Sequence, residues 1–343
     1  MALMINVLGA AARRRERVFR DRTNPLDLYD DREMFKKYRF NREGVMFLID
    51  LLSDDLEHAT GRSKALPASL QVFVALRFYA TGAVLDSTAT QHGCSISTTS
   101  RVVRRVTTAI CGKKDEFIKF PRSPEEVRKT QHDFFLLAGF PRVIGAVDGT
   151  HIRINGVALG AAEHLYVNRK GFYSINVQLT CDAQYYITSV SARWPGSTHD
   201  SRICRTSTIG EAFAAGILDG LLVGDSGYGL QTWLMTPVPI PTTRAERRYN
   251  QAHSCTRVVI EQVNGQWKSK FRCLIGSGLH MFPQRAADVI TACACLHNIS
   301  KHLRQPDVHQ ERAEEDGAEG HDEVRDAMSG RQARDDIINN FFT

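Results

Sequence analysis

Three acidic residues in the second half of the sequence lie in contexts typical of a catalytic site. Asp148 in AVDGT and Asp225 in VGDSGY each follow an apolar run and precede a small residue that we expect to end a strand. Glu261 lies in TRVVIEQVNGQWKSKF, where helical periodicity places Gly265 and Lys268 on the same face. An isolated Asp-Gly or Asp-Ser is more often a turn residue. The combination of two strand-end acids and one helical acid favours a site.

Carboxylates that converge at one point repel one another and take up protons unless cations hold them ionised. Magnesium or manganese ions suit such oxygen ligands. Two such ions about 4 Å apart can clamp the attacking and leaving oxygens of an in-line phosphoryl displacement. The sequence therefore predicts a divalent-metal site (Mg²⁺ or Mn²⁺) for the cleavage or joining of DNA strands, with Asp148, Asp225 and Glu261 as its central carboxylates.

Further polar residues accompany these acids. Asp200 in WPGSTHDSR follows a predicted strand through a Pro-Gly turn, so it is a fourth candidate metal ligand. Arg169 and Lys170 in VNRKG, together with Lys268 and Lys270, could hold DNA phosphates or could be solvated surface. We expect three other side chains to have packing roles: His151, Trp194 and Trp233. His151 could instead orient a water at the metal.

From about residue 139 onward the pattern indicates strands. The segment 142–154 is an apolar run that we expect to break at Asp148, residues 173–194 give two strands around a turn at 182–184, and residues 220–228 give a fourth. Helical patterns lie between and after these strands. We therefore predict a mixed α/β domain over residues 131–304.

Residues 1–130 have apolar spacings of three and four, which predicts a helical N-terminal domain. Within it, residues 85–110 read as a short helix, a turn at Gly93, an N-cap at Ser95 and a second helix, the order of a helix-turn-helix. A plain helical hairpin is the alternative. If the segment binds DNA, its second helix would place base-reading and phosphate-binding side chains in the major groove, namely Ser97, Thr98, Ser100, Arg101, Arg104 and Arg105.

Charge is distributed unevenly along the 343 residues. Residues 305–343 carry eleven acidic and four basic side chains, a net charge of −7, which leaves +13 on the first 304 residues. This excess suits a polyanionic partner such as DNA. We expect 305–343 to be an acidic, largely disordered tail with a short helix near 334–342.

Several broad classes are excluded by composition. No run of about 18 apolar residues exists to span a membrane, and the N-terminal apolar stretch precedes its arginines, the reverse of a secretory signal. The eight cysteines form no C-x-x-C pair, so we expect buried thiols in a reducing compartment. The basic cluster at residues 13–22 could be a nuclear address or a solvated helix face.

Several blocks resemble, in order, those of the Harbinger transposase-derived nucleases of the PIF/Harbinger DDE superfamily. They are VDGTHI, YVNRKGFYSINVQ, WPGSTHDSRI, VGDSGY, WLMTPV, RYNQAHSCTRVVIEQVNGQWKSKFRCL and LHNIS. The segment RFYATGAVLDSTATQHGCSISTTSRVV similarly resembles the family's helix-turn-helix region. At 262–264 the chain has Gln-Val-Asn, where autonomous transposases more often show Arg or Phe.

The resemblance implies an RNase H-like mixed sheet flanked by helices, with divalent metal held by Asp148, Asp200, Asp225 and Glu261. It also implies a separate Myb/SANT-like partner protein that assists DNA binding and nuclear entry. We accordingly expect a protein of the nucleus that is also found in the cytoplasm, and a homo-oligomer is compatible with the sequence.

Two other functions compete with a nuclease. The DGT of VDGTHI is similar to the motif of haloacid dehalogenase-type phosphatases, but the position of their nucleophile is occupied by Ala146, which argues against that class. A domesticated transposase that binds DNA without cutting it is the stronger rival. Retention of all four acids argues against the loss of cleavage.

Overall fold

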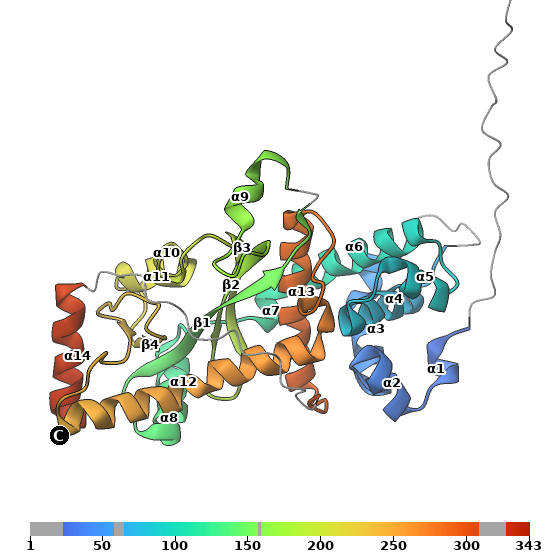
Figure 1. Ribbon diagram of the computed structural model, residues 1–343. Coiled ribbons are helices and arrows are strands. Elements are labelled where there is room, and N and C mark those ends of the chain that lie inside the picture. Colours follow the sequence, from blue (N-terminus) through green and yellow to red (C-terminus); the bar gives the residue numbers. More distant parts are fainter. Residues whose placement is uncertain (1–22, 58–64, 157–158, 309–326) are drawn as a thin grey trace, which may run out of the picture.

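The computed structural model describes residues 23–57, 65–156, 159–308 and 327–343. A helical bundle formed by the N-terminal part lies beside a sheet covered by helices (Figure 1). Among the described residues, the bundle contains α1 Pro25–Leu28, α2 Asp31–Tyr38, α3 Arg42–Leu56, α4 Ala68–Thr81, α5 Leu85–Gln91 and α6 Ile96–Gly112. The short α7 Lys114–Phe117 follows and contacts α6 and α13 Pro283–His302.

The centre of the bundle is α4, which is apolar on almost all sides. Phe73, Leu76 and Tyr79 are buried, and the Tyr38 ring of α2 meets Phe73 edge-on at 4.8 Å between centroids. A helix that is apolar all round must be enclosed by others, and here α2, α3, α5 and α6 contact it.

The segment from α5 to α6 has the local structure predicted for it. Gly93 in the turn has a φ of +60°, a left-handed conformation that glycine adopts without strain. The side chain of Ser95 then accepts a hydrogen bond from the Thr98 backbone N–H at 3.1 Å and caps α6. Contact between this element and DNA stays a prediction.

A five-stranded mixed sheet has the order β3-β2-β1-β4-β5. β1 pairs antiparallel with β2, and β2 with β3, whereas β1–β4 and β4–β5 are parallel. Four strands were expected; the fifth, β5, has only two residues and was missed. The strands are β1 Val143–Arg153, β2 Ser174–Cys181, β3 Ile187–Pro195, β4 Leu221–Val223 and β5 Leu234–Met235.

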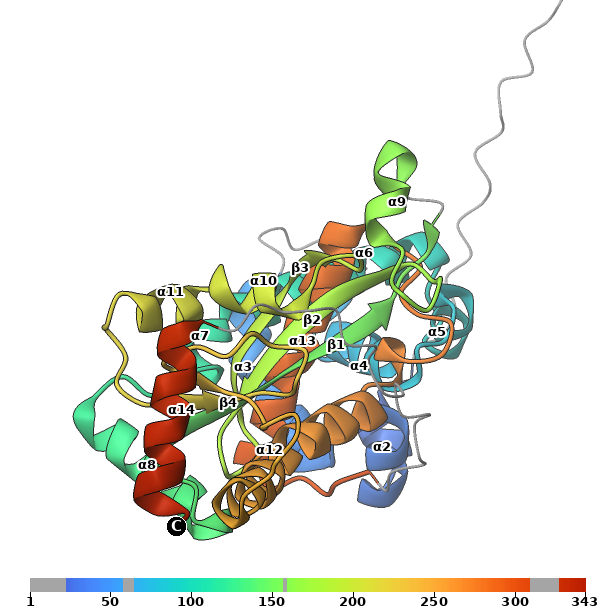
Figure 2. The same cartoon turned by 60° about the vertical axis from the view of Figure 1, so that its left-hand side comes forward.

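Helices cover both faces of this sheet (Figure 2). Alternate residues of β1 enter different cores: Ala146 belongs to the core that includes the long helices α12 and α13, and Val147 to the core that includes Cys204 and Phe213 of α10 and α11. α8 also packs on β1, although it spans the domain boundary expected at residue 130. The bounds are α8 Pro124–Ala138, α10 Asp200–Arg205, α11 Thr208–Ala214, α12 Arg244–Lys270 and α13 Pro283–His302.

Three shorter segments complete the chain between these elements: η2 Gly160–Ala162, α9 Glu163–Tyr166 and η3 Arg272–Leu274. Of the two tryptophans expected to pack, Trp233 is buried and stacks on Phe213 at 5.0 Å. Trp194 is half-buried and donates its indole N–H to Ser191 Oγ.

Over the described ranges, no helix is both long and apolar enough to cross a lipid bilayer.

The helix predicted near the C-terminus is present and longer than expected, as α14 Met328–Phe341. It lies against β5 and the N-terminal part of α12 (Figure 1). Ile337, Ile338 and Phe342 are buried in this contact, which gives the end of the acidic tail an apolar surface to pack. Residues 309–326, most of the tail expected to be disordered, lie outside the described residues, as does the basic cluster at 13–22.

Candidate active site

Asp148 lies within β1 and not at its end, contrary to the sequence-based expectation. The strand continues to Arg153 because β2 pairs along its whole second half, with Asp148 opposite Leu179. β4, on the other side, pairs with β1 only as far as Ala146. Asp148 therefore lies just past the point where β1 and β4 stop pairing.

Asp225 is a strand-end acid, as predicted. β4 ends at Val223 and Asp225 follows after Gly224. Its carboxylate Oδ1 accepts a hydrogen bond from the Gly227 backbone N–H at 3.0 Å, which holds the turn after the strand. Because β1 and β4 are parallel neighbours, Asp148 and Asp225 come from adjacent strands at the same edge.

The side chain of Asp148 faces α12. It shares a face of β1 with Ala146, and its Oδ2 accepts a hydrogen bond of 2.8 Å from the side-chain amide of Asn264, which is in α12. Both side chains are shielded from water, Asp148 partly and Asn264 almost completely. This hydrogen bond thus joins β1 to α12 near the point where β4 stops pairing with β1.

Asp200 reaches the same region from the other face of the sheet. It is the first residue of α10, and a Cβ atom at Gly149 would lie only 2.6 Å from the Asp200 carboxyl carbon. The side-chain amide of Asn176, in β2, donates to Asp200 Oδ1 at 2.7 Å and to the Thr198 carbonyl oxygen at 2.9 Å. Gly149 therefore gives the space in which Asp200 approaches the sheet.

The charges of neighbouring acids contribute to two pKa shifts in this region. Burial, the largest cause, and the neighbouring Asp225 raise the pKa of Asp200, while the Asn176 hydrogen bond lowers it. Burial also raises the pKa of Tyr228 strongly, and the negative charges of Asp200, Asp148 and Asp225 add to this increase. Tyr228 is thus a buried phenol among the three carboxylates, and its hydroxyl has no hydrogen-bond partner within the described part of the chain.

Glu261 stands apart from these three. It is exposed on α12, one turn before Asn264, and forms an ion pair with Arg257 on the same helix. Residues three apart on a helix share a face, so Glu261 and Asn264 point toward the same side of α12. Through Asn264, this face contacts Asp148.

The residues present fit a divalent cation. Their donor set consists of carboxylate oxygens, which suit Mg²⁺ or Mn²⁺, and burial, the largest cause, together with the Asp225 charge raises the pKa of Asp200. Across the residues that the structure describes, no three His, Cys, Asp or Glu side chains are already grouped as a metal site. Occupancy would therefore require rearrangement of these side chains, including release of Glu261 from Arg257.

Sequence reasoning did not assign a role to three residues that contact or surround the acids: Asn176, Tyr228 and Asn264. For Asn264 a signal existed, since it lies three residues after Glu261 in the predicted helix. For Asn176 the signal is the alternation of polar residues in SINVQLTC, a strand that is buried over its whole length. Tyr228 follows Asp225 in the same motif, but only the fold shows that it is buried.

The basic residues expected near the acids have different environments. Arg169 is exposed and donates to His199 Nδ1 at 2.8 Å, beside Asp200, while Lys170 is exposed and Lys268 half-buried. The suggestion that Lys270 tracks DNA is wrong. Its ammonium is buried, donates to the Pro306 carbonyl oxygen at 3.3 Å and lies 5.6 Å from the ring centre of Phe40, and burial lowers its pKa to about 8. His151 packs as expected, with Nδ1 3.0 Å from Ser174 Oγ on β2.

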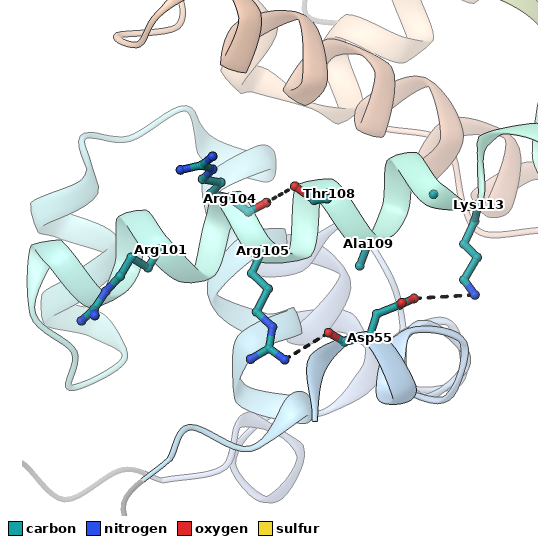
Figure 3. Close-up of a pocket in the computed structure, with 8 residues that line it drawn as sticks. Asp55, Arg101, Arg104, Arg105, Thr108, Ala109 and Lys113 are labelled. Carbon is teal, nitrogen blue, oxygen red and sulfur yellow. Dashed lines mark hydrogen bonds and ion pairs between the residues drawn. The ribbon is translucent and has the colours of Figure 1, made fainter. Parts of the chain in front are cut away.

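A second basic region lies on α6, where three arginines and Lys113 are among the residues that line a hollow of about 570 Å³ (Figure 3). Ser97, Arg101 and Arg104 are exposed along one face of the helix. Thr98 is half-buried in the N-cap, its hydroxyl 2.9 Å from Ser95 Oγ.

Arg105, expected to contact phosphate, is instead committed to the protein. Its guanidinium donates to the carbonyl oxygens of Asp55 and Glu57 at 3.1 and 2.8 Å, at the C-terminal end of α3 (Figure 3). Cations stabilise helix C-termini. Arg105 therefore anchors α6 to α3, and Arg101 and Arg104 are the arginines of this face that point outward.

Comparison with known proteins identifies the family of this chain. Residues 147–298, which contain all four acids, match the family model described as DDE superfamily endonuclease. Over 278 residues the chain is 40% identical to the human protein named "Putative nuclease HARBI1", an alignment that covers 80% of this chain and 79% of that protein. The Xenopus laevis protein of the same name is 35% identical over 278 residues, covering 80% of each chain.

More distant similarity extends to plants. The Arabidopsis thaliana protein named "Protein ALP1-like" is 25% identical over 288 residues, which cover 76% of this chain and 69% of that protein. No solved structure matches. On the family model and the 40% identity, this chain belongs to the Harbinger transposase-derived nuclease family of the DDE endonuclease superfamily.

Proposed function

We propose that this protein is a divalent-metal-dependent endonuclease that cleaves phosphodiester bonds of DNA. The observation that carries the proposal is that Asp148 and Asp225 leave adjacent strands where β1 and β4 separate, while the Asp200 carboxylate packs against Gly149, the residue after Asp148. The family relationship and the strand order support an RNase H-like fold for this region.

Each acid has a role in this proposal. Asp148 and Asp225 supply oxygen ligands from adjacent strands, Glu261 supplies a third from α12, and Asp200 is a fourth ligand from the opposite face of the sheet. A pair of Mg²⁺ or Mn²⁺ ions bound there would activate a water or a 3′-hydroxyl and stabilise the departing oxygen. Arg169, exposed beside His199 and Asp200, is placed to hold a phosphate of the strand to be cut, with Lys170 and Lys268 as further backbone contacts.

Plasmid nicking tests this proposal. Purified protein with Mg²⁺ or Mn²⁺ should nick supercoiled DNA, whereas EDTA should prevent nicking. Asp148→Asn and Glu261→Gln should abolish it, and Gln262→Ala, an exposed neighbour on α12, should leave it unchanged. Equal nicking by the Asp148 and Glu261 variants would refute the site.

A DNA-binding protein without cleavage is the second candidate. The observation in its favour is that the exposed face of α6, with Ser97, Arg101 and Arg104, lies on the helical bundle and needs none of the acids. An inert wild-type protein that still retards DNA in a gel would support this candidate over the nuclease.

We also propose that the protein works in the nucleus, with a further cytoplasmic population, and that a Myb/SANT-like protein assists it. The family relationship and the basic residues 13–22 support this proposal. Deletion of residues 13–22 should shift a fluorescent fusion from the nucleus to the cytoplasm, and co-expression of the partner should restore nuclear entry. A fusion whose distribution is unchanged by the deletion would argue against the basic segment as an address.

A further inference from the structure

Asn264 differs in its surroundings from Asn250, the other asparagine of α12. Only 8% of its surface is exposed, and its amide nitrogen donates to Asp148 Oδ2 at 2.8 Å. Its carbonyl oxygen Oδ1 is also buried, and no donor among the described residues reaches it. A buried amide oxygen without a partner costs about 1–3 kcal/mol, so this arrangement needs a reason beyond packing.

The geometry points to Asn264 as a positioning residue for Asp148 in the divalent-metal site. This inference rests on the proposed function and deepens it. The donated hydrogen bond fixes the orientation of the Asp148 carboxylate. The buried Asn264 Oδ1, which no donor among the described residues reaches, would accept a hydrogen bond from a water at the site.

The position of Asn264 on α12 supports this role. Glu261, the α12 residue proposed as a ligand, is exposed and paired with Arg257 in the structure, whereas Asn264 on the same helical face already touches an acid. Asn264 thus links α12 to β1 one turn after Glu261. On the other face, Asn176 holds Asp200 in the same way, with a buried and unpartnered Oδ1 of its own within the described chain.

Mn²⁺ binding tests this role without recourse to cleavage. The full-length protein, freed of metal with EDTA and dialysed, is titrated with MnCl₂ by isothermal calorimetry, and its Tm is measured separately in EDTA. Asn264→Leu keeps the side-chain size but removes the donor. We expect it to weaken Mn²⁺ binding by about 10- to 100-fold, the usual effect of losing a hydrogen bond to a metal ligand. Gln262→Leu, two residues earlier and exposed, should bind like wild type.

A second variant covers the case in which Asn264→Leu does not fold. Asn264→Ser is smaller and polar, too short to reach Asp148, and should show the same loss of affinity. A variant that keeps its Tm in EDTA and binds Mn²⁺ within twofold of wild type would overturn the role of Asn264. A wild-type protein that binds no Mn²⁺ would overturn the proposed nuclease site itself, and with it this inference.

Discussion

Arg257 and Glu261, one turn apart on α12, form an ion pair at the edge of the acidic site. The side chain of Glu261 is 46% exposed and that of Arg257 23%. An exposed pair of this kind is worth less than about 1 kcal/mol. The pair therefore competes only weakly with a divalent cation for the Glu261 carboxylate.

This pair predicts that Arg257→Gln will tighten Mn²⁺ binding. Without the guanidinium, Glu261 no longer has to leave a partner, and about 1 kcal/mol corresponds to at most a fivefold lower Kd. Calorimetric titration with MnCl₂ measures the change. Arg244→Gln, which neutralises an exposed arginine at the first residue of the same helix, is the matched control. A weaker affinity in Arg257→Gln would mean that Arg257 supports the site and does not compete with it.

Gly149 predicts a steric effect on the opposite face of the sheet. A Cβ atom there would lie 2.6 Å from the Asp200 carboxyl carbon, closer than real side chains pack. Gly149→Ala should therefore displace Asp200 and destabilise the protein by about 1–3 kcal/mol, as measured by urea denaturation. Gly112→Ala, in α6, is the control because nothing lies within 4 Å of its added methyl group. If both alanines are tolerated equally, Asp200 does not depend on the space at Gly149.

The arginines of α6 should separate into two classes. Arg104→Ala should weaken DNA binding and reduce the slope of log K against log salt by about one, because it removes one phosphate contact, while the Tm stays unchanged. Arg105→Ala should lower the Tm, because the Asp55 and Glu57 carbonyl oxygens lose their donor. Fluorescence anisotropy with a duplex at several salt concentrations, together with thermal melts, distinguishes these results. A salt slope unaffected by Arg104→Ala would remove α6 from the DNA interface.

Asp182 predicts a pH-dependent stability. Burial raises its pKa to about 6, although the Tyr186 and Gln184 backbone N–H groups donate to its Oδ1. Since the folded pKa is higher than the unfolded one, the folded state binds the proton more tightly between pH 4 and pH 6. Stability from this group is therefore full below about pH 4 and is lost as the pH rises through 6.

Asp182→Asn removes the ionisation but keeps an oxygen that can accept both hydrogen bonds. The difference in unfolding free energy between Asp182→Asn and wild type should grow in favour of the variant by about 1–2 kcal/mol from pH 4 to pH 7. Above pH 7 the difference should stay constant. Urea denaturation across this range measures the difference. The exposed Asp115, changed to Asn, is the control. A difference that does not vary with pH would mean that Asp182 does not titrate in this range.

The local properties of the chain were decided by the sequence itself. Local signals predicted the two strands on either side of the turn at 182–184, the Ser95 cap and the helix that carries Glu261. These features depend on side-chain period, capping and turn chemistry within a few residues. These are short-range preferences, so one sequence suffices to predict them. The identities of the four acids also follow from motifs that are local in the chain.

Only the tertiary structure decided how these pieces meet. β1 continues past Asp148 because β2 pairs there, and Asp148 becomes a site residue because β4 stops pairing at Ala146. Asn264 contacts an acid 116 positions away, and Lys270 and Arg105 are tied to distant backbone carbonyl groups. Such contacts depend on the packing of helices against the sheet and on desolvation, which no local pattern specifies. The sequence therefore determined which carboxylates could act. The fold decided which amides donate to them, and which basic side chains instead anchor the protein itself.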